Sequence, residues 1–172
     1  MAKYCPEKGG PALYTECLEC ELRGHCGTAP AEERPWRCII AGTRTFTDYQ
    51  LVLKTMAEIA ASIPKSRIEI ISGGASGADK LGELFARRNG LKLTVFPAEW
   101  KRYGYSAGPI RNRQMAEYAG KDGTLVAFWD ESSRGTLNMI RTAADAGLSC
   151  HVISIRPERY GMRLSLSEME KK

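Results

Sequence analysis

Four cysteines near the N-terminus have the spacing of a metal site. The pattern is C-x11-C-x2-C-x5-C, and its members are Cys5, Cys17, Cys20 and Cys26. A Cys-x-x-Cys pair is typical of one half of a tetrahedral zinc site, and His25 could replace one thiolate. A metal would also stabilise a segment this short, which has little core of its own. We therefore expect zinc, with an iron–sulfur cluster as the alternative and free thiols as the interpretation without a metal.

A second group of residues suits phosphate binding. The stretch Ile70-Ile-Ser-Gly-Gly-Ala-Ser-Gly-Ala-Asp79 begins like a strand, turns through three glycines and continues with a helical apolar pattern. Glycine lets the backbone turn sharply and lets a phosphate approach it, and the free N–H groups at the helix start face the anion. The spacing matches neither Gly-x-Gly-x-x-Gly nor Walker A, which disfavours a dinucleotide dehydrogenase and a P-loop ATPase. A tight turn without a ligand is the alternative.

Similar turns follow the first strand and open two later helices. They lie at 41–44, 108–113 and 133–136. We expect the N–H groups after Gly74 and Gly135 to hold phosphate oxygens, with a hydroxyl from Thr136 and a charge from Arg111. The full set of expected ligand-binding residues is Gly42, Thr43, Arg44, Gly73, Gly74, Ala75, Ser76, Gly77, Asp79, Arg111, Asn112, Arg134, Gly135 and Thr136.

Strand-like and helix-like segments alternate from residue 37 onward. The strand-like segments are 37–41, 68–72, 92–96, 125–129 and 150–155, and apolar residues at helical spacing follow each of the first, second and fourth. Thr47, with Gln50 three residues later, is expected to cap the first helix, and Pro109 to lie in the first turn of the third. The alternation predicts an α/β Rossmann-like domain, with a mainly parallel sheet and helices on both faces. Such sheets bind ligands at the carboxyl ends of their strands.

Composition divides the chain into three parts. Its 172 residues suit one domain with a short appendage. We expect a cysteine-rich, metal-binding module over 1–30, the Rossmann-like domain over 36–156 and a polar C-terminal tail over 157–172. The apolar runs are too short to cross a bilayer, and the N-terminus has no apolar signal region. We therefore expect a cytoplasmic protein with no membrane partner, in which Cys38 and Cys150 are small core residues.

The formal charge of +5 is unevenly spread along the chain. Residues 87–113 carry seven basic side chains and a single acidic one, Glu99. This excess favours an anionic ligand, although a solvated basic surface explains it equally well. Trp100, Tyr103 and Tyr105 lie in the same segment and could stack on the bases of a nucleic acid. Packing of these rings against the sheet is the interpretation that we favour.

Five motifs in this order resemble one known family. They are Ala41-Gly-Thr-Arg-Thr-Phe-Thr-Asp48, Ser72-Gly-Gly-Ala-Ser-Gly-Ala-Asp79, Phe96-Pro-Ala-Glu-Trp100, Ala107-Gly-Pro-Ile-Arg-Asn-Arg113 and Arg134-Gly-Thr136. Together they resemble the YspA-like branch of the SLOG superfamily, the Rossmann-like group that also contains the DprA and LOG proteins. The resemblance covers about 37–155. It implies a nucleotide-like ligand, often without a defined reaction.

The chain differs from the LOG enzymes at the position of their catalytic residue. Their Pro-Gly-Gly-x-Gly-Thr-x-x-Glu motif holds a phosphoribosyl group and supplies a carboxylate for cleaving the N-glycosidic bond. Here the matching stretch runs from Glu131 to Met139. Gly135 and Thr136 match, two serines replace the first glycines, and Met139 stands where the glutamate would be. A thioether is neither an acid nor a base, so the resemblance implies phosphate binding without hydrolysis.

Three functions follow from these observations. The first is a sensor or binding module for a nucleotide or nucleotide-derived phosphate ligand. The second is a LOG-like nucleotide hydrolase, for which Asp79, Arg111 and Glu99 are the polar groups to examine. The third is DprA-like binding of nucleic acid, which would weaken steeply with salt. A homo-oligomer is possible in each case.

Overall fold

The computed structural model describes residues 3–5, 10–12 and 34–169, and the chain divides into two compact units, Met1–Pro35 and Trp36–Lys172. In the first unit, β1 (Lys3–Cys5) pairs antiparallel with β2 (Gly10–Ala12). Cys5 ends β1, whereas Cys17, Cys20, His25 and Cys26 lie outside the described residues. The metal site therefore stays a prediction.

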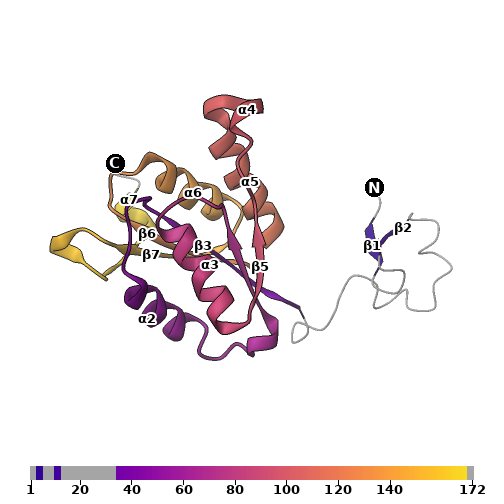
Figure 1. Ribbon diagram of the computed structural model, residues 1–172, viewed down its shortest axis with the longest axis horizontal. Helices are drawn as coiled ribbons and strands as arrows, with labels where there is room; N and C mark the ends of the chain where they lie inside the picture. Colours follow the sequence, from indigo (N-terminus) through magenta and orange to yellow (C-terminus); the bar gives the residue numbers. More distant parts are fainter. Residues whose placement is uncertain (1–2, 6–9, 13–33, 170–172) are drawn as a thin grey trace. The chain divides into compact units, whose positions relative to one another are not determined.

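The second unit is built on a six-stranded sheet (Figure 1). Its order is β5-β4-β3-β6-β7-β8. The bounds are β3 (Trp36–Gly42), β4 (Ile68–Ser72), β5 (Lys92–Val95), β6 (Thr124–Trp129), β7 (Ser149–Ser154) and β8 (Arg163–Leu164). The first five strands are parallel, as the sequence predicted, and β8 runs antiparallel to β7. This edge strand lies within the segment expected to be a polar tail.

Helices cover both faces of the sheet, which confirms the Rossmann-like α/β architecture. On one face, α2 (Tyr49–Ile59) and α3 (Ala78–Asn89) pack on a core that includes Ile40 and Phe128. On the other, α5 (Ala107–Ala119) and α6 (Arg134–Asp145) pack on a core that includes Ile39. Neighbouring residues of one strand thus serve opposite cores, because side chains alternate across a sheet.

The remaining helical segments are short. They are η1 (Lys65–Arg67), α4 (Trp100–Tyr103), η2 (Gly104–Ser106), η3 (Pro157–Arg159) and α7 (Leu166–Met169). The strand and helix patterns of the sequence do not predict α4 and η2. They carry the chain from β5 into α5, and their place at the carboxyl edge of the sheet makes them part of the site described below.

The predicted cap of α2 is wrong by one residue, whereas the predicted burial of two cysteines is confirmed. Asp48, and not Thr47, caps α2, since its Oδ1 accepts a hydrogen bond from the Leu51 N–H at 3.0 Å. The helix therefore begins one residue later than the expected capping box. Cys38 is fully buried and Cys150 partly buried against the core, which confirms both as core residues.

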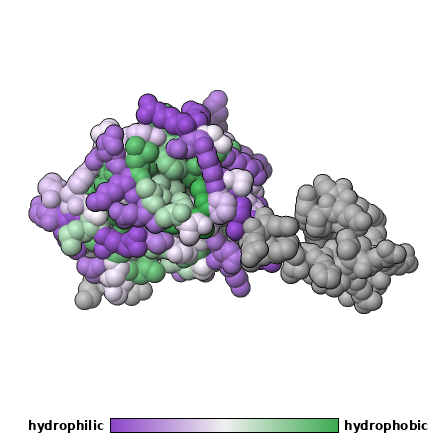
Figure 2. Space-filling view, turned by 90° about the horizontal axis from the view of Figure 1, so that it is seen from below, coloured by the Kyte–Doolittle hydropathy of each residue, from purple (hydrophilic) through white to green (hydrophobic). Residues whose placement is uncertain are grey.

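The surface of the second unit is mixed. Hydrophilic side chains predominate on the face drawn in Figure 2, around a smaller hydrophobic area near its centre. In the described part of the chain, no helix has the length and apolar character needed to span a bilayer.

Candidate functional site

A pocket of about 850 Å³ opens at the carboxyl edge of the sheet. Its walls come from the segments that follow β3, β4, β5 and β6. β3 and β6 are neighbours, but the helices that follow them, α2 and α6, pack on opposite faces. Ligands of open α/β sheets bind at such a switch point. The lining residues are Gly42, Arg44, Gly73, Gly74, Ala75, Ser76, Asp79, Pro97, Ala98, Trp100, Tyr105, Gly108, Pro109, Arg111, Asn112, Ser133, Arg134, Gly135, Thr136 and Asn138.

Twelve of the fourteen residues expected from the sequence line this pocket, and two do not. The exceptions, Thr43 and Gly77, join the loops behind it. Thr43 is buried, and its carbonyl oxygen accepts hydrogen bonds from the N–H groups of Phe46 and Ala78, at 3.2 and 3.4 Å. Gly77 has φ +76°, and a Cβ there would lie 2.3 Å from the Thr43 carbonyl oxygen. These two residues allow close backbone packing and do not line the ligand space.

Asp79 organises the glycine-rich loop. Its side chain is buried in the first turn of α3, where Oδ2 accepts hydrogen bonds from the N–H groups of Gly73 and Ala75, at 3.0 and 3.3 Å. The Gly74 N–H donates to Ser72 Oγ at 3.0 Å. The Ala75 N–H is the group after Gly74 that was expected to hold a phosphate oxygen. It donates to Asp79 instead and is therefore already satisfied within the protein.

Burial dominates the titration of Asp79. Desolvation raises the pKa of this carboxyl to about 6, although Arg111 and the two loop N–H groups act in the opposite direction. Arg111 Nη1 lies 3.5 Å from Asp79 Oδ2. The pair therefore places one partly compensated negative charge at the base of the glycine-rich loop.

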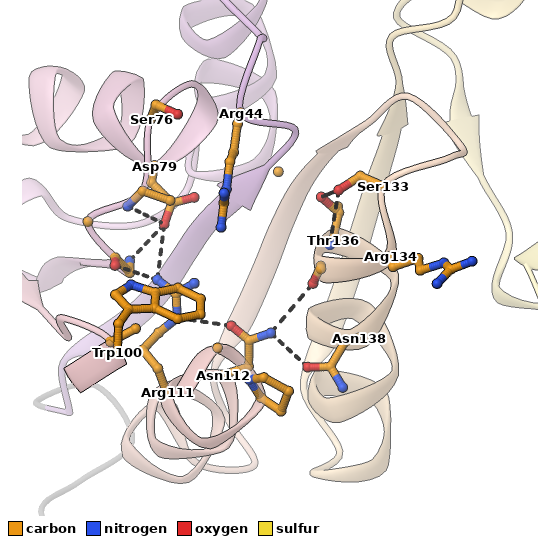
Figure 3. Close-up of a pocket in the computed structure, with 18 of the residues that line it drawn as sticks. Arg44, Ser76, Asp79, Trp100, Arg111, Asn112, Ser133, Arg134, Thr136 and Asn138 are labelled. Atoms are coloured by element: carbon orange, nitrogen blue, oxygen red, sulfur yellow. Dashed lines mark hydrogen bonds and ion pairs between the residues drawn. The ribbon is translucent and has the colours of Figure 1, made fainter. Parts of the chain in front are cut away.

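Arg111 links α5 to this loop (Figure 3). Its Nη1 donates to the Gly73 carbonyl oxygen, and its Nε donates to Asn112 Oδ1 at 3.0 Å. Asn112 Nδ2 donates in turn to Asn138 Oδ1 on α6, at 2.8 Å. Gly73 leaves room for the guanidinium, since a Cβ there would lie 1.5 Å from Arg111 Nη1. Arg111 and Asn112 thus connect three walls of the pocket.

Arg44 supplies the cation that is open to a ligand. Figure 3 shows it pointing into the pocket between the α3 side and the α6 side, whereas Arg134 points away from the other labelled residues. Among the described residues, no carboxylate pairs with Arg44. Burial, and then the charge of Arg44, lower the pKa of Arg111, while Asp79 raises it. An anion between the two arginines would remove their repulsion.

The start of α6 forms the opposite wall. Ser133 caps the helix, and its Oγ accepts from the Thr136 N–H at 3.4 Å and from the Thr136 hydroxyl at 3.0 Å. Because that hydroxyl is buried and already donates, Thr136 does not offer it to a ligand as expected. Within the described structure, the N–H groups of Arg134 and Gly135 have no acceptor. A Cβ on Gly135 would meet nothing within 4 Å, so the approach to these donors is open.

The carboxylate of the LOG motif has no counterpart in this pocket. Met139, which stands at its position, is 2% exposed and lies in the core between α6 and the sheet. Its neighbour Asn138 lines the pocket instead. Among the described lining residues, Asp79 is the single carboxylate. Glu99 is exposed, pairs with Arg102 at 3.5 Å and lies outside the lining set.

Two aromatic residues of the site were misassigned from the sequence. Trp100 and Tyr105 were expected to pack against the sheet, but they line the pocket with exposed fractions of 50% and 100%. Pro97, Ala98, Gly108, Pro109, Ser133 and Asn138 were also missed. The signal available in the sequence was position: these residues lie in the segments that follow β5 and β6, at the edge of the sheet where ligands bind.

Comparison with known proteins agrees with this geometry. Residues 36–103 match the model of the YspA, cpYpsA-related SLOG family. The first part of the α/β unit is therefore similar to the SLOG family. This match confirms the resemblance inferred from the motifs, three of which lie within the matched residues.

A solved structure has a similar fold. DNA processing protein A (DprA) from Streptococcus pneumoniae superposes with a TM-score of 0.50 at 18% sequence identity, over 71% of this chain and 51% of that chain. The present chain thus spans about half of that protein's length, and the likeness concerns the fold alone. No curated protein matches the chain.

Proposed function

We propose that the α/β unit binds a nucleotide or a nucleotide-derived phosphate ligand in this pocket, as a sensor or binding module. The observation that carries the proposal is Arg44. It points into the pocket without a carboxylate partner in the described structure, beside Arg111 and opposite the start of α6. Arg44 is exposed, so its guanidinium is accessible to an anion that enters the pocket.

The donors around this space suit a phosphate group. Arg44 offers guanidinium N–H groups, which bind phosphate oxygens in pairs. Arg111 adds its positive charge, although its Nη1 and Nε already donate to protein acceptors. Across the pocket, the N–H groups of Arg134 and Gly135 lie in the first turn of α6, where the helix dipole favours negative charge. The volume of about 850 Å³ lies within the ordinary range for small-molecule sites.

The polar groups support binding in preference to hydrolysis. Asp79 is the one carboxylate among the described lining residues, and one of its oxygens already accepts two backbone hydrogen bonds. Met139 belongs to the core and cannot reach a substrate in this pocket. A second carboxylate or a histidine for acid–base catalysis is missing from the described lining set.

Calorimetry against a panel of nucleoside mono- and diphosphates tests the proposal. We expect Arg44→Ala to cost roughly 1.5–3 kcal/mol of binding free energy, or about tenfold or more in affinity, because a charge-assisted hydrogen bond is lost. Gly135→Val should weaken binding at least as much, since Gly135 lines the pocket and a side chain there adds bulk beside the N–H groups of α6 without meeting protein atoms within 4 Å.

The matched control is Arg113→Ala. Arg113 is an exposed arginine of α5 that lies outside the lining set. Arg113→Ala therefore changes the net charge by the same amount as Arg44→Ala, but it should leave the affinity for the nucleotide unchanged. If a nucleotide binds and both Arg44→Ala and Gly135→Val retain wild-type affinity, the ligand site lies elsewhere.

A further inference from the structure

We propose that Trp100 and Tyr105 bind an aromatic base, so that the ligand is a purine or pyrimidine nucleotide and not a simple sugar phosphate. This inference rests on the proposed function and specifies the end of the ligand opposite its phosphate. It assigns the α4–η2 segment, between β5 and α5, as the part of the pocket that recognises the base.

Exposure distinguishes these two rings from the aromatic side chains of the core. Trp129, in the core, is 2% exposed, whereas Trp100 is 50% exposed and Tyr105 is 100% exposed. Both exposed rings line the pocket. A large ring left open to water at the mouth of a polar pocket gains a partner when a flat ligand covers it. Every nucleobase offers such a face, so stacking is the interaction expected.

Trp100 lies close to the start of α5. It begins α4, where its backbone N–H donates to the Ala98 carbonyl oxygen at 3.0 Å. A Cβ on Gly108, in the first turn of α5, would lie 3.4 Å from Trp100 Cη2. The absence of a side chain at Gly108 therefore lets the ring lie close to the helix. One edge of the indole thus lies near Gly108, and half of the residue's surface is exposed and open for stacking.

The pocket has two chemically different ends. Arg44 and the start of α6 provide charge and N–H donors, and the α4–η2 segment provides the aromatic rings. In Figure 3, Trp100 lies on the Arg111 side of the pocket, and Ser133 and Thr136 lie on the other. A nucleotide has the same division, with a charged phosphate at one end and a flat base at the other.

The third ring of this segment argues for a single nucleotide and against a nucleic-acid strand. Tyr103 lies outside the lining set, and the Arg102 guanidinium covers its ring at 4.9 Å from the centroid. Single-stranded nucleic acid is usually bound by a series of rings on which successive bases stack. Here the two rings that remain open face one pocket.

Binding measurements on the full chain test this inference. The probes are the adenosine, guanosine, cytidine and uridine 5′-diphosphates, with ribose 5-phosphate and pyrophosphate as ligands without a base. We expect at least one nucleoside diphosphate to bind about tenfold tighter than either ligand without a base, and to quench the fluorescence of the exposed Trp100. Trp100→Ala should abolish this preference and the quenching while pyrophosphate binds as before.

Tyr103→Ala is the matched control. It removes another exposed ring of α4 and should behave as wild type. Equal affinity for nucleoside diphosphates and ribose 5-phosphate would overturn the inference, as would a base preference that survives in Trp100→Ala. A ten-residue oligothymidylate that binds tightly while every nucleoside diphosphate fails would also overturn it, in favour of a nucleic-acid surface.

The same titrations separate this inference from the proposed function. If Arg44→Ala weakens every phosphate probe but Trp100→Ala changes nothing, the phosphate site stands and the base site is wrong. If Arg44→Ala binds every probe as the wild type does, the proposed function itself is wrong.

Discussion

Asp79 shows how a residue that suits a ligand site can serve the loop behind it. It lines the pocket, but its Oδ2 accepts two N–H groups of the glycine-rich loop and faces Arg111. The carboxylate thereby fixes Gly73 and Ala75 and supports the guanidinium at the same time. Burial of this charge destabilises the folded state, and the effect on the free energy of unfolding can be measured.

The raised pKa of Asp79 predicts a specific dependence of stability on pH. In the unfolded chain this carboxyl has its ordinary pKa of 3.8, and desolvation raises the pKa to about 6 in the folded state. Between these values the folded state binds more protons than the unfolded state. The stabilisation is therefore complete below pH 3.8 and is lost as the pH rises through 6, by about 3 kcal/mol.

Urea unfolding of wild type and Asp79→Asn, measured from pH 4 to pH 7.5, checks this expectation. Wild type should lose stability relative to Asp79→Asn as the pH rises, since the variant lacks the titrating group. Parallel profiles, or a relative gain by wild type, would show that Arg111 and the loop N–H groups outweigh burial.

Sequence patterns identified the right loops but not the role of each residue within them. Thr43 and Gly77 stood in motifs expected to contact a ligand, but they hold two loops together. Trp100 and Tyr105 were expected to pack against the sheet, but they are exposed and line the pocket. Residue type and spacing indicate burial and turns, whereas the side of a loop that faces a pocket depends on packing between distant segments.

At the scale of elements, periodicity predicted the five parallel strands and the helices between them. It missed β8, which has two residues, and α4, which has four, because elements this short show no period. Both are placed by tertiary contacts, such as the hydrogen bond from the Ser154 N–H to the Met162 carbonyl oxygen, at 2.8 Å beside β8. Trp100, in the aromatic wall of the pocket, belongs to α4. Because α4 was not predicted, this wall was not predicted either.

Two glycines that flank α3 allow a direct test of the contact between loops. Both have positive φ, +76° at Gly77 and +62° at Gly90, but a Cβ would clash with Thr43 at the first and meet nothing within 4 Å at the second. Gly90→Ala should cost about 1–2 kcal/mol of unfolding free energy for its backbone conformation. Gly77→Ala should cost about 1–3 kcal/mol more. Its Cβ overpacks against Thr43, and its backbone, with ψ −127° against +34° at Gly90, lies outside the left-handed helical region.

Chemical denaturation of the two variants measures this difference. Equal losses of stability would mean that the loops after β3 and β4 separate freely, and that Gly77 is required for its backbone conformation alone.

At the scale of the whole molecule, we propose that the N-terminal unit binds zinc through Cys5, Cys17, Cys20 and Cys26. The proposal rests on their spacing and on the short length of the segment. Elemental analysis of the freshly purified chain should find about one zinc per molecule. Cys17→Ser or Cys20→Ser should lower the zinc content without changing the thermal unfolding of the α/β unit, which has its own core.

Cys150→Ser provides the control for that experiment. Cys150 belongs to β7 of the α/β unit, so this change should leave the zinc content as it is. An iron signal in place of zinc would favour a cluster, and neither metal in the wild-type chain would contradict the proposal.

A phosphate group bound between Arg44, Arg111 and the start of α6 is the central claim for this molecule. The most direct test is a ¹H–¹⁵N NMR titration of the full chain with a nucleoside diphosphate. The largest shift changes should occur at the backbone amides of Arg134 and Gly135 and at the side-chain Nε of Arg44. Changes confined to residues outside the pocket, such as the β7–β8 edge, or no changes at millimolar ligand would contradict it.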